Sequence, residues 1–262
     1  MIYYYSIIIF LLGISIGSFV NVLIDRIPSG ESILIDRSHC DKCLHKLSWY
    51  DLLPILSFIF LNRKCRYCRR VISWQYPLVE VINGLLYLII YYLFSINIIP
   101  GSYTTLIYLF ILSSGLLAVF MIDLKYRIIP DQVLIAMLAI SVIYKMFFHD
   151  GDSMQILNAF LSAVIVSLIF MFLVIITKGK GMGMGDVKFS FLMGILLGYP
   201  DIIAAFYLSF LTGAAISIIL ILLNRKKMKE TIPFGPFLSA ATLITLLFGH
   251  NIITFYKHIS GF

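Results

Sequence analysis

Two aspartates in apolar surroundings are the residues of this sequence best suited to chemistry. Asp123 ends the apolar stretch "AVFMID", and Asp186 follows "GMGMG" at the start of another. Two carboxylates held close together cannot both ionise cheaply, so they share a proton, and one acts as base while the other acts as acid. Such a pair can activate water for peptide hydrolysis. For either residue alone, an interfacial anchor or a helix cap is an equally good explanation.

Glycines crowd the segment in front of the second aspartate. Gly181, Gly183 and Gly185 all precede Asp186. A residue without Cβ can adopt a positive φ and lets another backbone approach closely. We therefore predict that an extended substrate backbone lies against Gly183 and Gly185. The alternative is a flexible linker, and the presence of Asp123 as a partner for Asp186 favours the substrate-binding interpretation.

All four cysteines lie in one polar segment, as "CDKC" (Cys40, Cys43) and "CRYC" (Cys65, Cys68). Two Cys-x-x-Cys pairs at this separation match a tetrahedral zinc site with four thiolate ligands. A segment this short buries too little apolar surface to be stable without such a cross-link. Because thiolates would fill every coordination position, the predicted zinc is structural. A redox pair and inert free thiols are the alternatives.

The composition indicates an integral membrane protein, because 61% of the 262 residues are hydrophobic and only 13% are charged. We predict an all-α polytopic fold with a helix at 1–24, a zinc-binding loop domain at 25–76 and a membrane domain at 77–262. The first run lacks signal-peptide features, so we expect it to be retained. The sixth run is short enough to be re-entrant. About eight apolar runs approach the length of a membrane span, near 2–24, 78–96, 103–122, 131–148, 154–177, 186–199, 201–223 and 232–250.

Basic residues predict the orientation in the membrane. Of the 20 Lys and Arg residues, 18 lie in the segments 25–75, 123–131, 178–188 and 224–230. Under the positive-inside rule these segments are cytoplasmic, and both termini then lie outside. Asp123 and Asp186 would meet at the cytoplasmic face of the cell membrane. Since topology explains the net charge of +7, we expect no nucleic-acid partner.

The motifs resemble those of the bacterial type IV prepilin peptidases. "GMGD" from Gly183 to Asp186 is similar to the Gly-x-Gly-Asp signature of membrane aspartyl peptidases. The cysteine pairs and several other stretches match in family order: "GSFVNVLIDRIP", "YDLLPILS", "ISWQYPLVE", "DLKYRIIPD" and "PFGPFL". The resemblance implies eight membrane helices and cleavage of the basic leader of pilin-like precursors, with catalysis by Asp123 and Asp186. Asp131 is the rival in the first motif, although an N-terminal capping role is enough to explain it.

The resemblance also implies methylation of the new N-terminal amine with S-adenosylmethionine, but one departure weakens this second activity. Family members usually have a glycine two residues before the third cysteine, associated with methyl transfer, and here the residue is Arg63. Glu80 and Asn83, one helical turn apart, and Asn21 at the matching depth of the first helix are candidates to bind the cofactor. Hydrogen bonding from helix to helix is the alternative role for these residues.

The partners implied are prepilin or pseudopilin precursors and membrane lipids. A basic leader must dock on a face that is itself basic, so local carboxylates or anionic lipid headgroups would have to attract it. The candidate carboxylates are Asp36, Asp41 and Asp51. Two other functions fit less of the sequence: a transporter whose membrane carboxylates relay cations, and a membrane scaffold that docks partners through the cysteine loop.

Overall fold

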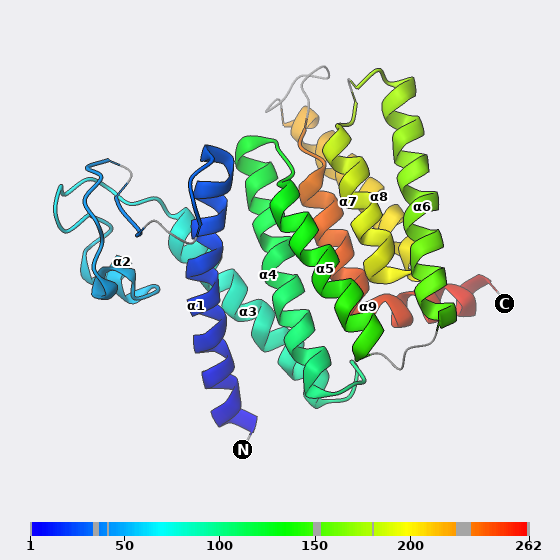
Figure 1. The fold of residues 1–262 in the computed structure, drawn as a ribbon, viewed down its shortest axis with the longest axis horizontal. Helices are drawn as coiled ribbons and strands as arrows, with labels where there is room; N and C mark the ends of the chain where they lie inside the picture. Colours follow the sequence, from blue (N-terminus) through cyan, green and yellow to red (C-terminus); the bar gives the residue numbers. More distant parts are fainter. Residues whose placement is uncertain are drawn as a thin grey trace. The chain divides into compact units, whose positions relative to one another are not determined.

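The computed structural model describes residues 2–33, 37–40, 42–148, 153–179, 181–223 and 232–260 (Figure 1). Regular structure within these ranges is helical, apart from two isolated β-bridges in the loop after the first helix. The elements are α1 (Ile2–Ser29), the 3-10 helix η1 (Trp49–Leu52), α2 (Leu56–Phe60), α3 (Gln75–Ser95), α4 (Tyr103–Tyr126), α5 (Asp131–Phe147), α6 (Ser153–Ile176), α7 (Met184–Leu197), α8 (Asp201–Leu222) and α9 (Gly235–Ser260).

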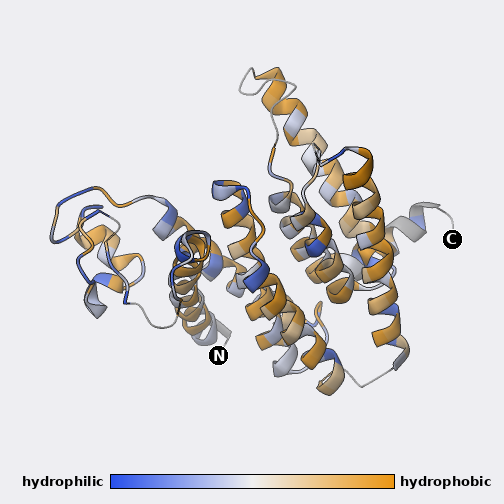
Figure 2. Cartoon of the chain, turned by 45° about the horizontal axis from the view of Figure 1, so that its top comes forward, coloured by the Kyte–Doolittle hydropathy of each residue, from blue (hydrophilic) through white to orange (hydrophobic). Residues whose placement is uncertain are grey.

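Five helices are long and apolar enough to cross a membrane, which agrees with the predicted multi-pass, all-α class. They are Tyr4–Ser29, α3, α4, α6 and α8, and α9 contains a shorter apolar stretch at Gly235–Gly249. Figure 2 shows hydrophobic residues along most of the long helices. Helices also occupy the other predicted runs, but a count of eight spans stays a prediction. At 1.5 Å per residue, the 14 residues of α7 extend only about 21 Å, less than a hydrocarbon core.

The chain forms two compact units, residues 1–118 and 119–262, whose boundary falls within α4. In the first unit, α1 packs against α3 through glycines. A Cβ on Gly13 would lie 2.8 Å from the Gly84 Cα, and one on Gly17 would lie 2.8 Å from the Glu80 Cα. The two backbones are therefore in contact, as expected where small residues four apart line a membrane-helix interface.

In the second unit, α7 is the helix that the others surround, since it contacts α5, α6, α8 and α9. Its Phe189, Leu192 and Met193 are buried. Gly194 lies directly against the Ala163 backbone of α6, so no larger residue fits there. These contacts fix the position of the first turn of α7, which carries Asp186.

Substitution of Gly13 tests the contact between α1 and α3. We expect Gly13→Val to force the helices apart and to lower stability by about 1–3 kcal/mol, the usual cost of overpacking. Thermal unfolding of the purified protein in detergent measures the effect. Ser15→Val is the matched control, because Ser15 is exposed on the same helix. Equal unfolding temperatures for the two variants would contradict the close packing described here.

Candidate active site and metal-binding loop

Asp123 lies in the last turn of α4 with only 5% of its surface exposed. Its Oδ2 accepts a hydrogen bond of 2.8 Å from the Gly235 N–H. Gly235 is the first residue of α9, and the free amides at a helix start carry partial positive charge. A Cβ on Gly235 would approach the same carboxylate oxygen to 2.7 Å, so this position requires glycine. Gly235 is not among the residues predicted from the sequence to form the site, although its motif "PFGPFL" belongs to the family resemblance.

Asp186 is the third residue of α7 and is 8% exposed. Its Oδ2 accepts the Gly183 N–H at 2.9 Å. This bond satisfies an amide just before the helix, as the acidic residue of a capping box does. Each aspartate therefore has one oxygen bonded to a main-chain amide. For Asp123 the amide is that of the first residue of α9, and for Asp186 it is that of the residue just before α7.

Both predicted aspartates are buried in the second unit, near enough for their charges to interact. The charge of Asp123 acts unfavourably on the ionised Asp186 carboxylate, and Arg127 contributes a favourable charge near Asp123. Because both carboxylates are buried, water screens their repulsion less than it would at the surface. Proton sharing relieves such repulsion.

Asp131 lies in a different environment from this pair. It is the first residue of α5 and is exposed, and both its carboxylate oxygens contact the Lys188 Nζ, at 2.7 and 2.9 Å. The ion pair joins the start of α5 to α7, two residues beyond Asp186. Asp131 therefore links the two motifs, while Asp123 is the buried carboxylate.

The glycines before Asp186 are used differently from the expectation. None of Gly181, Gly183 and Gly185 has a positive φ, so of the two uses of glycine only close approach applies here; contact with a substrate backbone stays a prediction. Gly183 is extended, with φ −92°, and Gly185 already belongs to α7. A Cβ on Gly185 would lie 3.0 Å from the Ile129 Cβ, whereas one on Gly183 would meet no atom closer than 3.8 Å. Gly185 thus permits packing against the loop after α4, and space remains beside Gly183.

The four cysteines form the predicted cluster. Their Sγ atoms all lie within 4.8 Å of one another, and those of Cys40 and Cys68 are 3.9 Å apart. Four thiolates at about 2.3 Å from one tetrahedral ion would be separated by about 3.8 Å. All four are free thiols, so the residues fit a single metal ion.

The two cysteine pairs are built in the same way. Leu44 donates its N–H to the Cys40 carbonyl, and Arg69 donates its N–H to the Cys65 carbonyl. Both donors have positive φ, 56° and 58°. Each turn therefore folds its two thiols to one side, as a metal-binding knuckle requires.

Arg63 occupies the position at which family members usually have a glycine. The backbone conformation at this position explains why glycine suits it. Its φ is 61°, in the left-handed region where glycine is favoured. The Arg63 guanidinium lies 4.7 Å from the centre of the Trp74 ring. This cation–π contact helps to offset the conformational cost.

Asp51, one of the carboxylates suggested to attract a basic leader, is already paired. It contacts the Arg66 Nε at 2.7 Å and accepts the Tyr67 hydroxyl at 3.2 Å. The hydrogen bond to Asp51 raises the pKa of the Arg66 guanidinium above its usual value. Asp51 therefore stabilises the loop; Asp36 and Asp41 lie outside the described residues.

The three candidate cofactor residues occupy the interface of α1 and α3. Asn83 is fully buried; its Nδ2 donates to the Gly13 carbonyl at 2.7 Å, and its Oδ1 accepts from Ser114 at 2.9 Å. Glu80 Oε2 accepts the Ile55 N–H at 2.8 Å, which ties α3 to the loop. Asn83 thus hydrogen-bonds from helix to helix, which is the alternative to a role in cofactor binding.

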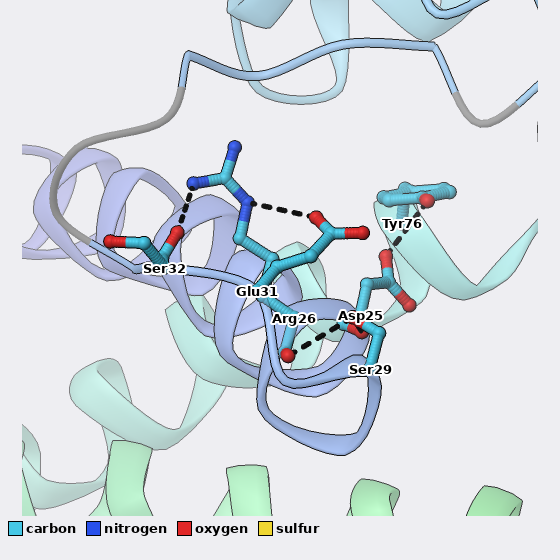
Figure 3. Close-up of polar contacts among 6 residues, drawn as sticks. All are labelled: Asp25, Arg26, Ser29, Glu31, Ser32 and Tyr76. Atoms are coloured by element: carbon cyan, nitrogen blue, oxygen red, sulfur yellow. Dashed lines mark hydrogen bonds and ion pairs between the residues drawn. The ribbon is translucent and has the colours of Figure 1, made fainter.

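Asn21 differs from the other two because part of its amide is unsatisfied. Its Nδ2 donates to the Tyr76 carbonyl at 3.0 Å, while its buried Oδ1 has no hydrogen-bond partner within the described residues. One turn further along α1, Asp25 accepts the Tyr76 hydroxyl at 2.8 Å, and Arg26 donates to the Ser32 carbonyl (Figure 3). Polar contacts therefore continue along this end of the α1–α3 interface.

The helical membrane fold and the coupled aspartates are the arrangement expected of a membrane aspartyl peptidase. Comparison with known families agrees: residues 11–94 match the bacterial peptidase A24 N-terminal domain, and residues 110–218 match the type IV leader peptidase family. These two matches cover the cysteine loop and both aspartates.

Curated relatives identify the family more closely. The prepilin leader peptidase/N-methyltransferase of Bacillus subtilis is 31% identical, over 95% of this chain and 96% of the relative. The enzyme of that name from Aeromonas salmonicida is 30% identical, over 97% and 94%, and that from Pseudomonas aeruginosa 28%, over 96% and 93%. The chain belongs to the prepilin leader peptidase/N-methyltransferase family. No solved structure matches it significantly.

Metal content tests the cysteine cluster. We expect one metal ion per chain in the purified protein and loss of most of it in Cys68→Ser, because a missing thiolate opens the tetrahedral site. Elemental analysis measures this directly. Lys42→Ser, an exposed position within the first knuckle, should keep the ion. A metal-free wild-type protein with freely alkylated thiols would rule out the site.

Proposed function

We propose that this protein is a prepilin leader peptidase that cleaves the basic leader of pilin-like precursors with Asp123 and Asp186. The observation that carries the proposal is the pair itself: two buried, electrostatically coupled carboxylates on motifs that match the family. The relatives are named for cleavage of prepilins, which supports the same class of substrate.

The geometry around the pair suits proton transfer. With one proton shared, the ionised carboxylate accepts a proton from water, and the resulting hydroxide attacks the scissile carbonyl. The protonated carboxylate then donates to the leaving amine. The Gly235 and Gly183 amides each hold one oxygen, which fixes the orientation of both groups. The space beside Gly183 gives a substrate backbone a place next to Asp186.

Asp123 is the better candidate than Asp131 for the first catalytic position. Asp131 is exposed and bonded to Lys188, so water and an ammonium group already stabilise its charge. Asp123 is buried and its charge acts on Asp186, so protonation of one carboxylate relieves repulsion. We assign Asp131 a positioning role between α5 and α7.

The predicted topology places this chemistry at the cytoplasmic membrane face. Asp123 follows a membrane-spanning apolar stretch, and Lys125, Arg127 and Lys188 lie close to the pair in sequence. Basic residues beside a span favour the cytoplasmic side. A precursor would present its leader there while its apolar segment stays in the bilayer.

Substitution of the acidic residues tests the peptidase assignment. We expect Asp123→Asn and Asp186→Asn each to lower precursor cleavage by at least about a hundredfold, since neither variant has both proton-transfer groups. Asp131→Asn is the matched control and should stay within a few-fold of wild type. Gel analysis of a prepilin-type precursor in detergent measures cleavage. Full processing by either of the first two variants would disprove the assignment.

For the cysteine loop, we propose structural zinc. Four thiolates are the preferred ligand set of this ion in small loop-rich folds, and they leave no open position for a substrate. The two similar knuckles support this view. The zinc would stabilise the loop and take no part in peptide cleavage.

Methyl transfer from S-adenosylmethionine to the new N-terminal amine is the second proposed activity. The relatives are named N-methyltransferases, and Arg63 adopts a left-handed backbone, the conformation that glycine favours. Among the candidate cofactor residues, Glu80 and Asn21 are the stronger. Glu80 offers a carboxylate that can attract the cationic sulfonium, and Asn21 has a buried carbonyl oxygen in need of a donor.

Glu80→Gln separates the charge of Glu80 from its bond to the loop, because an amide oxygen can still accept the Ile55 N–H. We expect about a tenfold or larger rise in the KM for S-adenosylmethionine with cleavage retained, since a lost charged contact is worth about 1.5–3 kcal/mol. Mass spectrometry of the processed N-terminus measures methylation and cleavage together. Glu31→Gln, at an exposed glutamate, is the control. An unchanged KM would remove Glu80 from the cofactor site.

A further inference from the structure

One edge of the metal-binding loop is exposed and strongly apolar. This apolar edge runs from Trp49 to Phe60, and these two residues are 77% and 79% exposed. Phe58 alone among its large side chains turns inward, against the Trp74 ring at 5.1 Å between centroids. The remaining exposed large side chains of the edge are Tyr50, Leu52, Leu53, Leu56 and Ile59. An apolar patch of this kind on a water-facing loop calls for a partner.

A hydrogen bond fixes the apolar edge near the end of a membrane helix. Ile55, immediately before α2, donates its N–H to Glu80 Oε2 at 2.8 Å. Glu80 is five residues into α3, about 8 Å along the helix axis from its first residue. Figures 1 and 2 show α2 to the side of α1 and α3. The apolar edge is therefore beside the membrane helices, level with the first turns of α3.

The backbone beside this bond is strained, which indicates that the position is enforced. Ile55 has φ 60° and ψ −48°, a conformation rare for a β-branched residue. The Glu80 carboxylate is the side-chain partner of its amide. Such strain persists only where surrounding contacts determine it.

A run of basic residues follows the apolar edge directly. The segment from Asn62 to Val71 contains five Lys and Arg residues and no acidic residue. All five are exposed: Arg63, Lys64, Arg66, Arg69 and Arg70. Asp51 already pairs with Arg66, which leaves four cations for a partner. Apolar and aromatic side chains flanked by cations are the composition of segments that lie in the interface of an anionic membrane. Each cation near such a surface adds about 1 kcal/mol of attraction.

We propose that the metal-binding loop docks on the bilayer, with the apolar edge inserted below the headgroups and the basic run on anionic phospholipids. The loop is then a membrane-associated element in addition to the spanning helices. This surface shares no residue with the aspartate pair and does not depend on the proposed peptidase activity.

The two tryptophans of the chain make the proposal directly measurable, because both belong to the loop. In a Trp74→Phe variant, Trp49 is the sole tryptophan. We would reconstitute this full-length variant in vesicles of phosphatidylglycerol and phosphatidylcholine whose acyl chains carry bromine near the headgroups. We expect at least about a twofold loss of Trp49 fluorescence relative to unbrominated vesicles, and little quenching by aqueous iodide.

Matched variants separate the apolar and electrostatic contributions to docking of the loop on the bilayer. Ile59→Ser with Phe60→Ser should reduce quenching by the brominated lipid, and Arg69→Gln with Arg70→Gln should reduce it chiefly in anionic vesicles. Lys42→Gln, an exposed change in the other knuckle, is the control and should leave quenching unchanged. The metal content of each variant verifies that the loop remains folded.

Three outcomes would overturn the proposal. Strong quenching by iodide without quenching by brominated lipid would place Trp49 in water. Protection of Trp49 from both quenchers would show that protein covers the apolar edge. Equal quenching of Trp49 by brominated lipid in anionic and neutral vesicles would show that the basic run does not bind anionic phospholipids.

Discussion

The bond between the Gly235 amide and the Asp123 carboxylate is the constraint on which the second unit depends. It joins the end of α4 to the start of α9 across 112 residues of sequence. A buried carboxylate without partners would be costly, so this contact is part of the fold as well as of the site. Between these ends, α7 packs against α5, α6, α8 and α9, and this packing positions the turn that carries Asp186. A displacement of α9 would therefore be transmitted to the aspartates through one hydrogen bond.

Much of the architecture could be predicted because apolar runs of membrane length are strong signals. Most predicted runs begin and end within a few residues of the helices, and the cysteine spacing predicted the thiolate cluster. Two helices continue well past their predicted ends: α9 reaches Ser260, ten residues beyond 250, and α1 reaches Ser29, five residues beyond 24. Asp25 and Arg26 end the apolar run but not the helix, because Tyr76 and Ser32 satisfy their side chains. Hydropathy locates hydrocarbon-facing residues, not helix ends.

The sequence could not reveal contacts that depend on packing between distant segments. Glycine serves both left-handed turns and close approaches of backbones, and composition does not distinguish the two uses. Gly185 and Gly235 proved to serve close approaches, to Ile129 and to Asp123. The pairing of Lys188 with Asp131 and of Glu80 with the Ile55 amide likewise joins residues whose spacing has no recognisable pattern. These long-range contacts give the motifs their positions.

Arg63 has a thermodynamic consequence for the metal. Since metal binding and folding of a small loop are coupled, strain in the folded loop is subtracted from the binding free energy. A non-glycine residue in the left-handed region costs about 1–2 kcal/mol, equivalent to about a five- to thirtyfold weaker apparent affinity. The cation–π contact of Arg63 with Trp74 offsets about 0.5–1 kcal/mol of this conformational cost, the usual value at an exposed site. The metal affinity of this chain is thus linked to one aromatic ring outside the coordination sphere.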